Sequence, residues 1–160
     1  MEKDLKDIVH EWVARISERR KEIGGLSLCP FSMKALVENK VFWTTLEQDP
    51  EIYIENYLSK LSDFEVAIFF DTKKELTDNN LIEIITRLNK KREDLIFMKS
   101  HPDKPGYVQG ISTGNRVYPA ILVQPKYKLL MARRLLKKTK YYDFWDEEYK
   151  NEIWGYGNEL

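Results

Sequence analysis

Apolar and polar side chains follow each other along this chain with two periods, one typical of helices and one typical of strands. Over residues 3–22 the apolar positions recur at helical spacing, with charges on the other face, and Gly24 and Gly25 follow the pattern. Glycine is common directly after a helix, so this segment is predicted to be a helix that ends there. Further helices are predicted from Cys29 to about Asn39, from Asp49 to about Leu61, from Thr77 to about Leu88, from Tyr127 to Lys138 and from Asp143 to Trp154.

Short runs rich in β-branched and aromatic residues predict four strands between these helices. The runs are Val41–Leu46, Phe64–Phe70, Asp94–Met98 and Tyr118–Val123. The second run is nearly all apolar, which is typical of a central strand that is covered on both faces. Because alternate strand residues point to opposite faces, Val66, Ile68 and Phe70 are expected opposite Ala67 and Phe69.

The order of these elements predicts the fold class. Two helices come first, strands and helices then alternate, and two adjacent strands precede the last two helices. Between the adjacent strands, residues 103–116 are rich in Gly, Pro, Ser and Asn, which predicts a long loop. The 160 residues fit one domain, 1–160. The sequence therefore predicts a single α+β domain with a roughly four-stranded sheet, helices packed against it and helical ends, and it leaves the strand order open.

The bulk composition narrows the functions to consider. Lys and Arg together number 26, as do Asp and Glu, so the chain lacks the basic excess that nucleic-acid binding favours. No apolar run approaches the roughly 20 residues of a membrane span, and the charged N-terminus lacks the apolar core of a signal peptide. The single cysteine suits a reducing compartment. A cytoplasmic protein without membrane or nucleic-acid partners is therefore expected.

Cys29 is the sharpest local feature of the sequence because Pro30 follows it directly. Proline suits the first position of a helix, so the pair predicts Cys29 at a helix N-cap. Backbone N–H groups and the helix dipole favour a thiolate there, which would make Cys29 a nucleophile, a redox centre or a metal ligand. The alternative is a small buried apolar side chain, a common role for a free cysteine.

Four further residues are candidates for the same site. His101 ends a predicted strand and begins the long loop, so it is a candidate base for the thiol or a metal ligand. The alternative is a histidine that hydrogen-bonds the loop backbone. Arg116, near Asn115 and Ser112 in the loop, is a candidate anchor for a small anionic ligand, because its planar guanidinium matches a carboxylate or phosphate.

Two C-terminal features have structural and functional interpretations. Residues 126–140 are basic, and a solvated helix face is expected to hold Arg133, Arg134, Lys137, Lys138 and Lys140. Residues 141–154 are rich in tyrosine and tryptophan. Such a segment either packs back on its own domain or forms a surface for self-association or a protein partner.

Segments around these candidates also resemble a known family. The quoted segments are Trp12, Leu26–Phe31, Ser100-His101-Pro102 and Asn115–Pro119. They resemble the bacterial family known as domain of unknown function 1415, whose members carry a tryptophan before an N-L-C-P-F-A-like segment, then F-H-P-like and N-R-S-P-Y-P-like segments. Here serines replace the asparagine of the first segment and the phenylalanine of the second, and the last segment is one residue short. The resemblance implies no reaction, but it places Cys29, His101 and Arg116 among the positions to test.

A shorter resemblance concerns the cysteine alone. Cys29-Pro30-Phe31-Ser32 is similar to the C-P-F/Y-S turn of monothiol glutaredoxins. In that family a strand leads into the turn and a T-V-P segment faces the thiol, whereas here a helix and two glycines come first and no T-V-P segment exists. The likeness supports thiol chemistry rather than a glutaredoxin fold.

These observations lead to one hypothesis and two alternatives for the function. The hypothesis is a small thiol-centred enzyme or thiol-dependent binding protein that uses Cys29, His101 and Arg116. The first alternative is a non-enzymatic binding or regulatory protein that uses its aromatic C-terminus. The second is a metal or haem site formed by Cys29 and His101. The sequence does not identify a cofactor.

Overall fold

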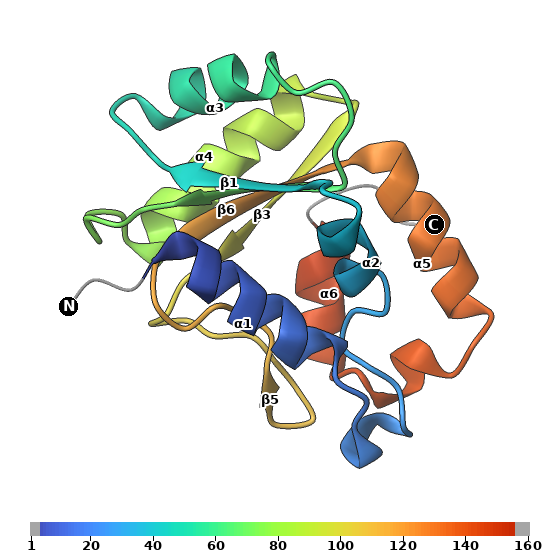
Figure 1. The fold of residues 1–160 in the computed structure, drawn as a ribbon. Coiled ribbons are helices and arrows are strands. Elements are labelled where there is room, and N and C mark those ends of the chain that lie inside the picture. The colour runs from blue at the N-terminus through green and yellow to red at the C-terminus, as the bar shows by residue number, and fades with distance from the viewer. Residues whose placement is uncertain (1–3, 156–160) are drawn as a thin grey trace.

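A four-stranded mixed sheet forms the centre of the protein, as Figure 1 shows for the computed structural model, which describes residues 4–155. The strands are β1 (Val41–Thr45), β2 (Val66–Phe70), β3 (Leu95–Ser100) and β6 (Ala120–Pro125), in the spatial order β1-β2-β6-β3. β1 and β2 are parallel, and β6 is antiparallel to both of its neighbours. The predicted α+β class with four main strands is therefore confirmed.

One face of the sheet is covered by α3 (Pro50–Leu58) and α4 (Asp78–Lys91). α4 begins at a capping box in which the Thr77 side chain accepts from the backbone of Asn80 and the Asn80 side chain accepts from the backbone of Thr77. The apolar residues of both helices pack on the strands in one buried cluster that includes Ile54, Phe69, Leu81, Ile85, Leu88, Phe97, Ile121 and Val123.

The opposite face is covered by two helices over its β1–β2 half. α1 (Leu5–Ser17) and α2 (Ser32–Val37) pack there in a second cluster that includes Ile8, Val9, Trp12, Ala35, Ile68, Phe70 and Tyr118. Ile68 and Phe70 thus face α1, whereas Ala67 and Phe69 face α3 and α4, which confirms the alternation predicted for the central strand.

The first and last predicted helices differ from the structure at their ends, and the second, α2, is shorter than predicted at both ends. α1 ends at Ser17 rather than near residue 22, because the backbone N–H of Arg20 bonds to the carbonyl of Leu26 and a short 3-10 helix, η1 (Lys21–Ile23), follows. The C-terminal helix is divided into a 3-10 helix, η2 (Tyr141–Phe144), and α6 (Glu147–Gly155). α5 (Lys126–Lys137) matches its prediction closely.

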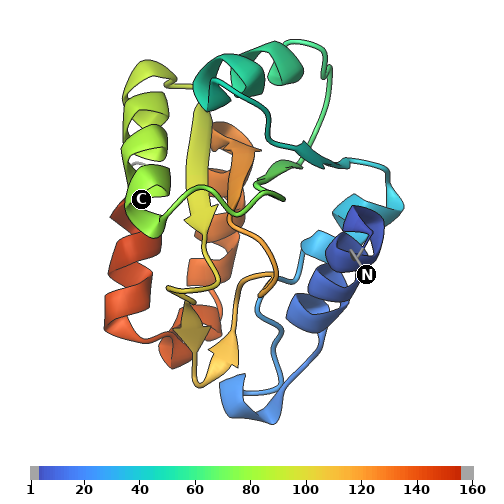
Figure 2. The same cartoon turned by 90° about the vertical axis from the view of Figure 1, so that its left-hand side faces the viewer.

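The predicted long loop, residues 103–116, contains a small two-stranded hairpin that the sequence analysis did not predict. β4 (Tyr107–Val108) and β5 (Ile111–Ser112) pair across a two-residue turn. Both turn residues have positive φ, 49° at Gln109 and 79° at Gly110, which is the conformation that glycine favours and that suits tight hairpins. Figure 2 shows the hairpin between α1 and α6.

Side chains of α1 hold the end of this hairpin in place. The indole Nε1 of Trp12 donates to the carbonyl of Thr113 at 2.9 Å, and a guanidinium nitrogen of Arg15 donates to the carbonyl of Ser112 at 2.5 Å. The hairpin is therefore fixed to the helix layer. No helix within residues 4–155 has the length and apolar content needed to cross a bilayer.

Candidate functional site

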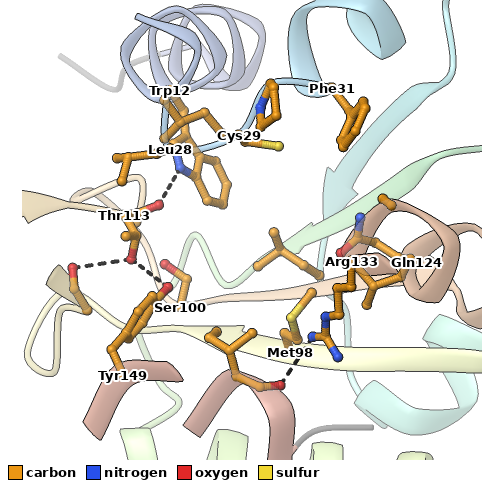
Figure 3. Close-up of a pocket in the computed structure, with 18 of the residues that line it drawn as sticks. Trp12, Leu28, Cys29, Phe31, Met98, Ser100, Thr113, Gln124, Arg133 and Tyr149 are labelled. Atoms are coloured by element: carbon orange, nitrogen blue, oxygen red, sulfur yellow. Dashed lines mark hydrogen bonds between the residues drawn. The ribbon is translucent and has the colours of Figure 1, made fainter. Parts of the chain in front are cut away.

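The β3–β6 half of the α1 face is not packed closely but borders a cavity of about 970 Å³ (Figure 3). Met98 and Ser100 of β3 and Leu122 and Gln124 of β6 line it from the sheet, and Met98 pairs with Leu122 in register. α1 and α2 border the cavity on one side, and α5, η2 and α6 border it on another. A volume of this size is typical of a small-molecule site.

Two groups of polar side chains lie at separate ends of the cavity, which charged residues such as Lys34, Glu65 and Lys104 also line. In Figure 3, Ser100, Thr113 and Tyr149 lie together at one side, and Arg133 and Gln124 lie at the other. The Tyr149 hydroxyl donates to the Thr113 hydroxyl at 2.9 Å, which donates to the carbonyl of Gly106 at 3.2 Å. The wall between the two ends is formed by apolar and aromatic side chains, including Trp12, Leu28, Met98, Leu122, Leu129 and Leu136.

Exposed apolar side chains surround the mouth of the cavity. Tyr127, Met131 and Leu135 recur every four residues along α5, and each has more than half of its surface exposed. Phe31, directly before α2, is also exposed and lines the same cavity. Apolar side chains that remain in water around a cavity mouth commonly mark a binding site.

Cys29 lies in the cavity wall, half-buried, and Figure 3 shows its sulfur pointing into the cavity. Its backbone is fixed because its N–H donates to the carbonyl of Ile16 at 2.8 Å and its carbonyl accepts from the Ser32 hydroxyl at 3.1 Å. The predicted helix N-cap at Cys29 was wrong: α2 begins at Ser32, and Phe31 is its N-cap. A six-residue helix that begins three residues later provides no dipole argument for a thiolate at Cys29.

His101 lines the same cavity but is engaged with the backbone through both ring nitrogens. Its Nε2 lies 2.9 Å from the carbonyl of Leu76, and its Nδ1 accepts from the N–H of Asp103 at 3.1 Å. When Nδ1 accepts from Asp103, Nε2 is the ring nitrogen that can donate to the carbonyl of Leu76. Among residues 4–155, no hydrogen bond joins His101 to Cys29, so the structure brings the two to one cavity without pairing them.

The three loop candidates have different environments. Asn115 is buried, and its side chain closes a turn by accepting from the N–H groups of Val117 and Tyr118 and donating to the carbonyl of Tyr118. Arg116 is exposed at the cavity lining, with a φ of 72°. Ser112 is buried and lines the cavity, and its hydroxyl has no hydrogen-bond partner within the described residues.

Arg133 is the functional candidate that sequence reasoning missed. It was expected on a solvated basic face, but only 3% of its surface is exposed. It is buried because it lies on the side of α5 that faces the cavity. Arg133 follows Leu129 by four residues and precedes Leu136 by three, and all three line the cavity. That helical spacing was the signal in the sequence. Burial lowers the pKa of Arg133, against an opposing effect of Tyr142.

The aromatic segment after α5 packs on its own domain. Phe144, Trp145 and Tyr149 contact a third apolar cluster made by η1 and the hairpin. Tyr141 is buried, donates to the carbonyl of Leu28, and has its pKa raised chiefly by burial. Burial also raises the pKa of Tyr149, to about 12, although the hydrogen bond to Thr113 lowers it. The side chain of Trp154, part of the predicted aromatic surface, lies outside the described residues.

One structural observation bears on the metal-site hypothesis, and comparisons with known proteins bear on possible relatives of the chain. Within residues 4–155, no three His, Cys, Asp or Glu side chains form a group that can hold a metal ion. Comparison with protein-family models, with curated proteins and with solved structures finds no match. The resemblances of the cysteine and histidine segments therefore stay predictions.

Proposed function

We propose that this protein binds a small, largely apolar molecule in the cavity and that the Cys29 thiol contacts the bound ligand. The observation that carries the proposal is the cavity of about 970 Å³, which has a mainly apolar lining and opens between exposed apolar side chains of α5 and Phe31. Leaving such surface in water costs free energy that a bound apolar molecule recovers.

The geometry favours thiol-dependent binding over thiol catalysis. A nucleophilic cysteine requires a base within hydrogen-bond distance or a strongly positive local field. No described side chain forms a hydrogen bond with the Cys29 sulfur, and both nitrogens of His101 are already bonded to the backbone. Catalysis at Cys29 would require His101 to leave one of these bonds, whereas binding requires no such change.

Titration with the neutral fluorophore N-phenyl-1-naphthylamine tests the proposal. We expect a saturable increase in fluorescence, and we expect the bound fluorophore to slow alkylation of Cys29 by iodoacetamide. Because the chain has one cysteine, the extent of labelling reports on Cys29 alone. The Ala132→Phe variant, which adds a ring to the α5 side of the cavity, is expected to weaken binding.

Ala14→Phe is the matched control, because it adds the same ring at an exposed position of α1 that does not line the cavity. It should bind the fluorophore as the unchanged protein does. Absence of saturable binding to the unchanged protein would refute the proposal. Binding that leaves the alkylation rate of Cys29 unchanged would refute the part assigned to the thiol.

A further inference from the structure

We infer that the natural ligand carries an anionic group of carboxylate size, which binds Arg133 inside the cavity while the apolar body extends toward the mouth. This inference rests on the proposed function and names the class of ligand. It follows from Arg133, whose side chain lies within the cavity wall, has one unpaired terminal nitrogen and is shielded from water.

The guanidinium of Arg133 is held but not neutralised. One terminal nitrogen donates to the carbonyl of Ile153 in the last turn of α6 at 3.3 Å. The other terminal nitrogen is buried without a hydrogen-bond partner in the described part of the chain, and no carboxylate of residues 4–155 forms an ion pair with Arg133. A buried cation without a counter-ion is costly, and an anion bound beside it removes that cost.

The surroundings of Arg133 define how the ligand lies. Figure 3 shows the guanidinium next to Met98, on the opposite side of the cavity from the Tyr149–Thr113 hydroxyl pair. Tyr127, Met131 and Leu135, on the same helix as Arg133, are exposed at the mouth. A molecule that places its charge at Arg133 can therefore lie along the apolar wall and contact these exposed side chains.

Other cations around the cavity do not replace Arg133. Among the described residues, no other lysine or arginine is as deeply buried as Arg133. Lys99 is bonded to Asp78 at 2.8 Å and to Glu152 at 3.3 Å, and Lys128 is bonded to Asp63 at 2.8 Å. One buried guanidinium with one free nitrogen fits a single small anion rather than a polyphosphate.

Two matched fluorophores test this inference separately from the proposed function. 1-Anilinonaphthalene-8-sulfonate has the same aromatic body as the neutral N-phenyl-1-naphthylamine but carries a sulfonate. We expect Arg133→Met to weaken binding of the sulfonate by at least about tenfold and to change binding of the neutral compound by less than about threefold. Arg134→Met removes the same charge from the exposed neighbour, so both affinities should stay within about twofold.

The outcomes distinguish the two proposals. If Arg133→Met weakens the binding of both fluorophores equally, or of neither, the anion site is refuted and the proposal of an apolar binding cavity is unaffected. Failure of both to bind the unchanged protein would overturn the proposed function. Near-ultraviolet circular dichroism and a cooperative urea transition must show that Arg133→Met retains the fold.

A second measurement needs no variant and covers the case in which Arg133→Met does not fold. Decanoate and decanol have chains of equal length and differ in the charge of the headgroup. At neutral pH, decanoate is expected to raise the melting temperature of the unchanged protein and to displace the sulfonate fluorophore at lower concentration than decanol. Equal effects of the two compounds would overturn the inference.

Discussion

The two faces of the sheet use the same four strands but are covered to different degrees. Along β6, Ile121 and Val123 are fully buried against α4, whereas Leu122 and Gln124 on the other face are half-buried beside the cavity. The α3–α4 face thus forms a closed core. On the other face, α1 and α2 cover only the β1–β2 half, and the remaining half borders the cavity. One sheet therefore has a closed core on one side and, on the other, an open surface to which we assign the proposed ligand binding.

The largest expected difference between the faces concerns adjacent residues of β3. Phe97 is fully buried on the α4 face, and Met98 points into the cavity. Phe97→Ala should lower the free energy of unfolding by about 3–5 kcal/mol, because it leaves a new void in a closed core. Met98→Ala should cost less than half as much, because its side chain already borders open space. Urea unfolding of both variants measures the difference, and equal losses would mean that the two faces are packed alike.

Substitutions that enlarge a side chain provide a second test of the difference in packing between the two faces. Ala67 is fully buried in the closed core, and Ala132 lies on the cavity side of α5. Ala67→Phe is expected to destabilise the protein by about 1–3 kcal/mol or more, because overpacking displaces neighbouring side chains. Ala132→Phe should leave the unfolding free energy nearly unchanged while reducing fluorophore binding. A strongly destabilised Ala132→Phe would show that the cavity does not accept a side chain.

The closed core was predictable from the sequence, and the cavity was not. The nearly all-apolar run that includes Val66, Ile68 and Phe70 indicated a strand covered on both sides, because burial on two faces requires apolar residues at every position. The period of a strand does not say how far the covering helices extend across the sheet. That extent depends on tertiary packing, which is a property of segments far apart in the chain.

For the candidate site residues, too, the sequence predicted one part and tertiary packing determined the other. Cys29, His101, Ser112 and Arg116 were placed near one site by local signals, and all four line the cavity. Their chemistry was not predictable, because the hydrogen bonds of His101 depend on the position of Leu76. Arg133 was assigned to the surface because charged residues usually lie there. Its spacing from Leu129 and Leu136, however, placed it on the side of α5 that faces the cavity.

The cavity side should also be the more sensitive to alkaline pH. The pKa of Tyr149 is raised by burial to about 12, whereas an ordinary tyrosine has a pKa near 10. Between these values the unfolded chain releases the proton and the folded protein keeps it, so unfolding becomes more favourable as pH rises. Between about pH 10 and 12, the contribution of Tyr149 to the free energy of unfolding should fall by up to about 1.4 kcal/mol per pH unit.

Two tyrosine variants separate the contribution of Tyr149 from other effects of alkaline pH on stability. Tyr149→Phe should lose part of the pH dependence of the unfolding free energy between about pH 10 and 12. Tyr107→Phe, at an exposed position in the hairpin, is the control and should keep it. An unchanged slope in Tyr149→Phe would contradict the assignment.

The smallest expected effect concerns Arg116, the arginine that the sequence favoured as the anion anchor. Its side chain is exposed, so water and salt screen its charge, whereas Arg133 is shielded. Arg116→Ala should change the unfolding free energy by less than about 0.5 kcal/mol, because alanine has the same Cβ at this positive-φ position. The affinity for 1-anilinonaphthalene-8-sulfonate should fall by less than about threefold, against at least tenfold for Arg133→Met. A larger fall in Arg116→Ala than in Arg133→Met would make Arg116 the anchor and would place the charge of the ligand at the mouth of the cavity rather than inside it.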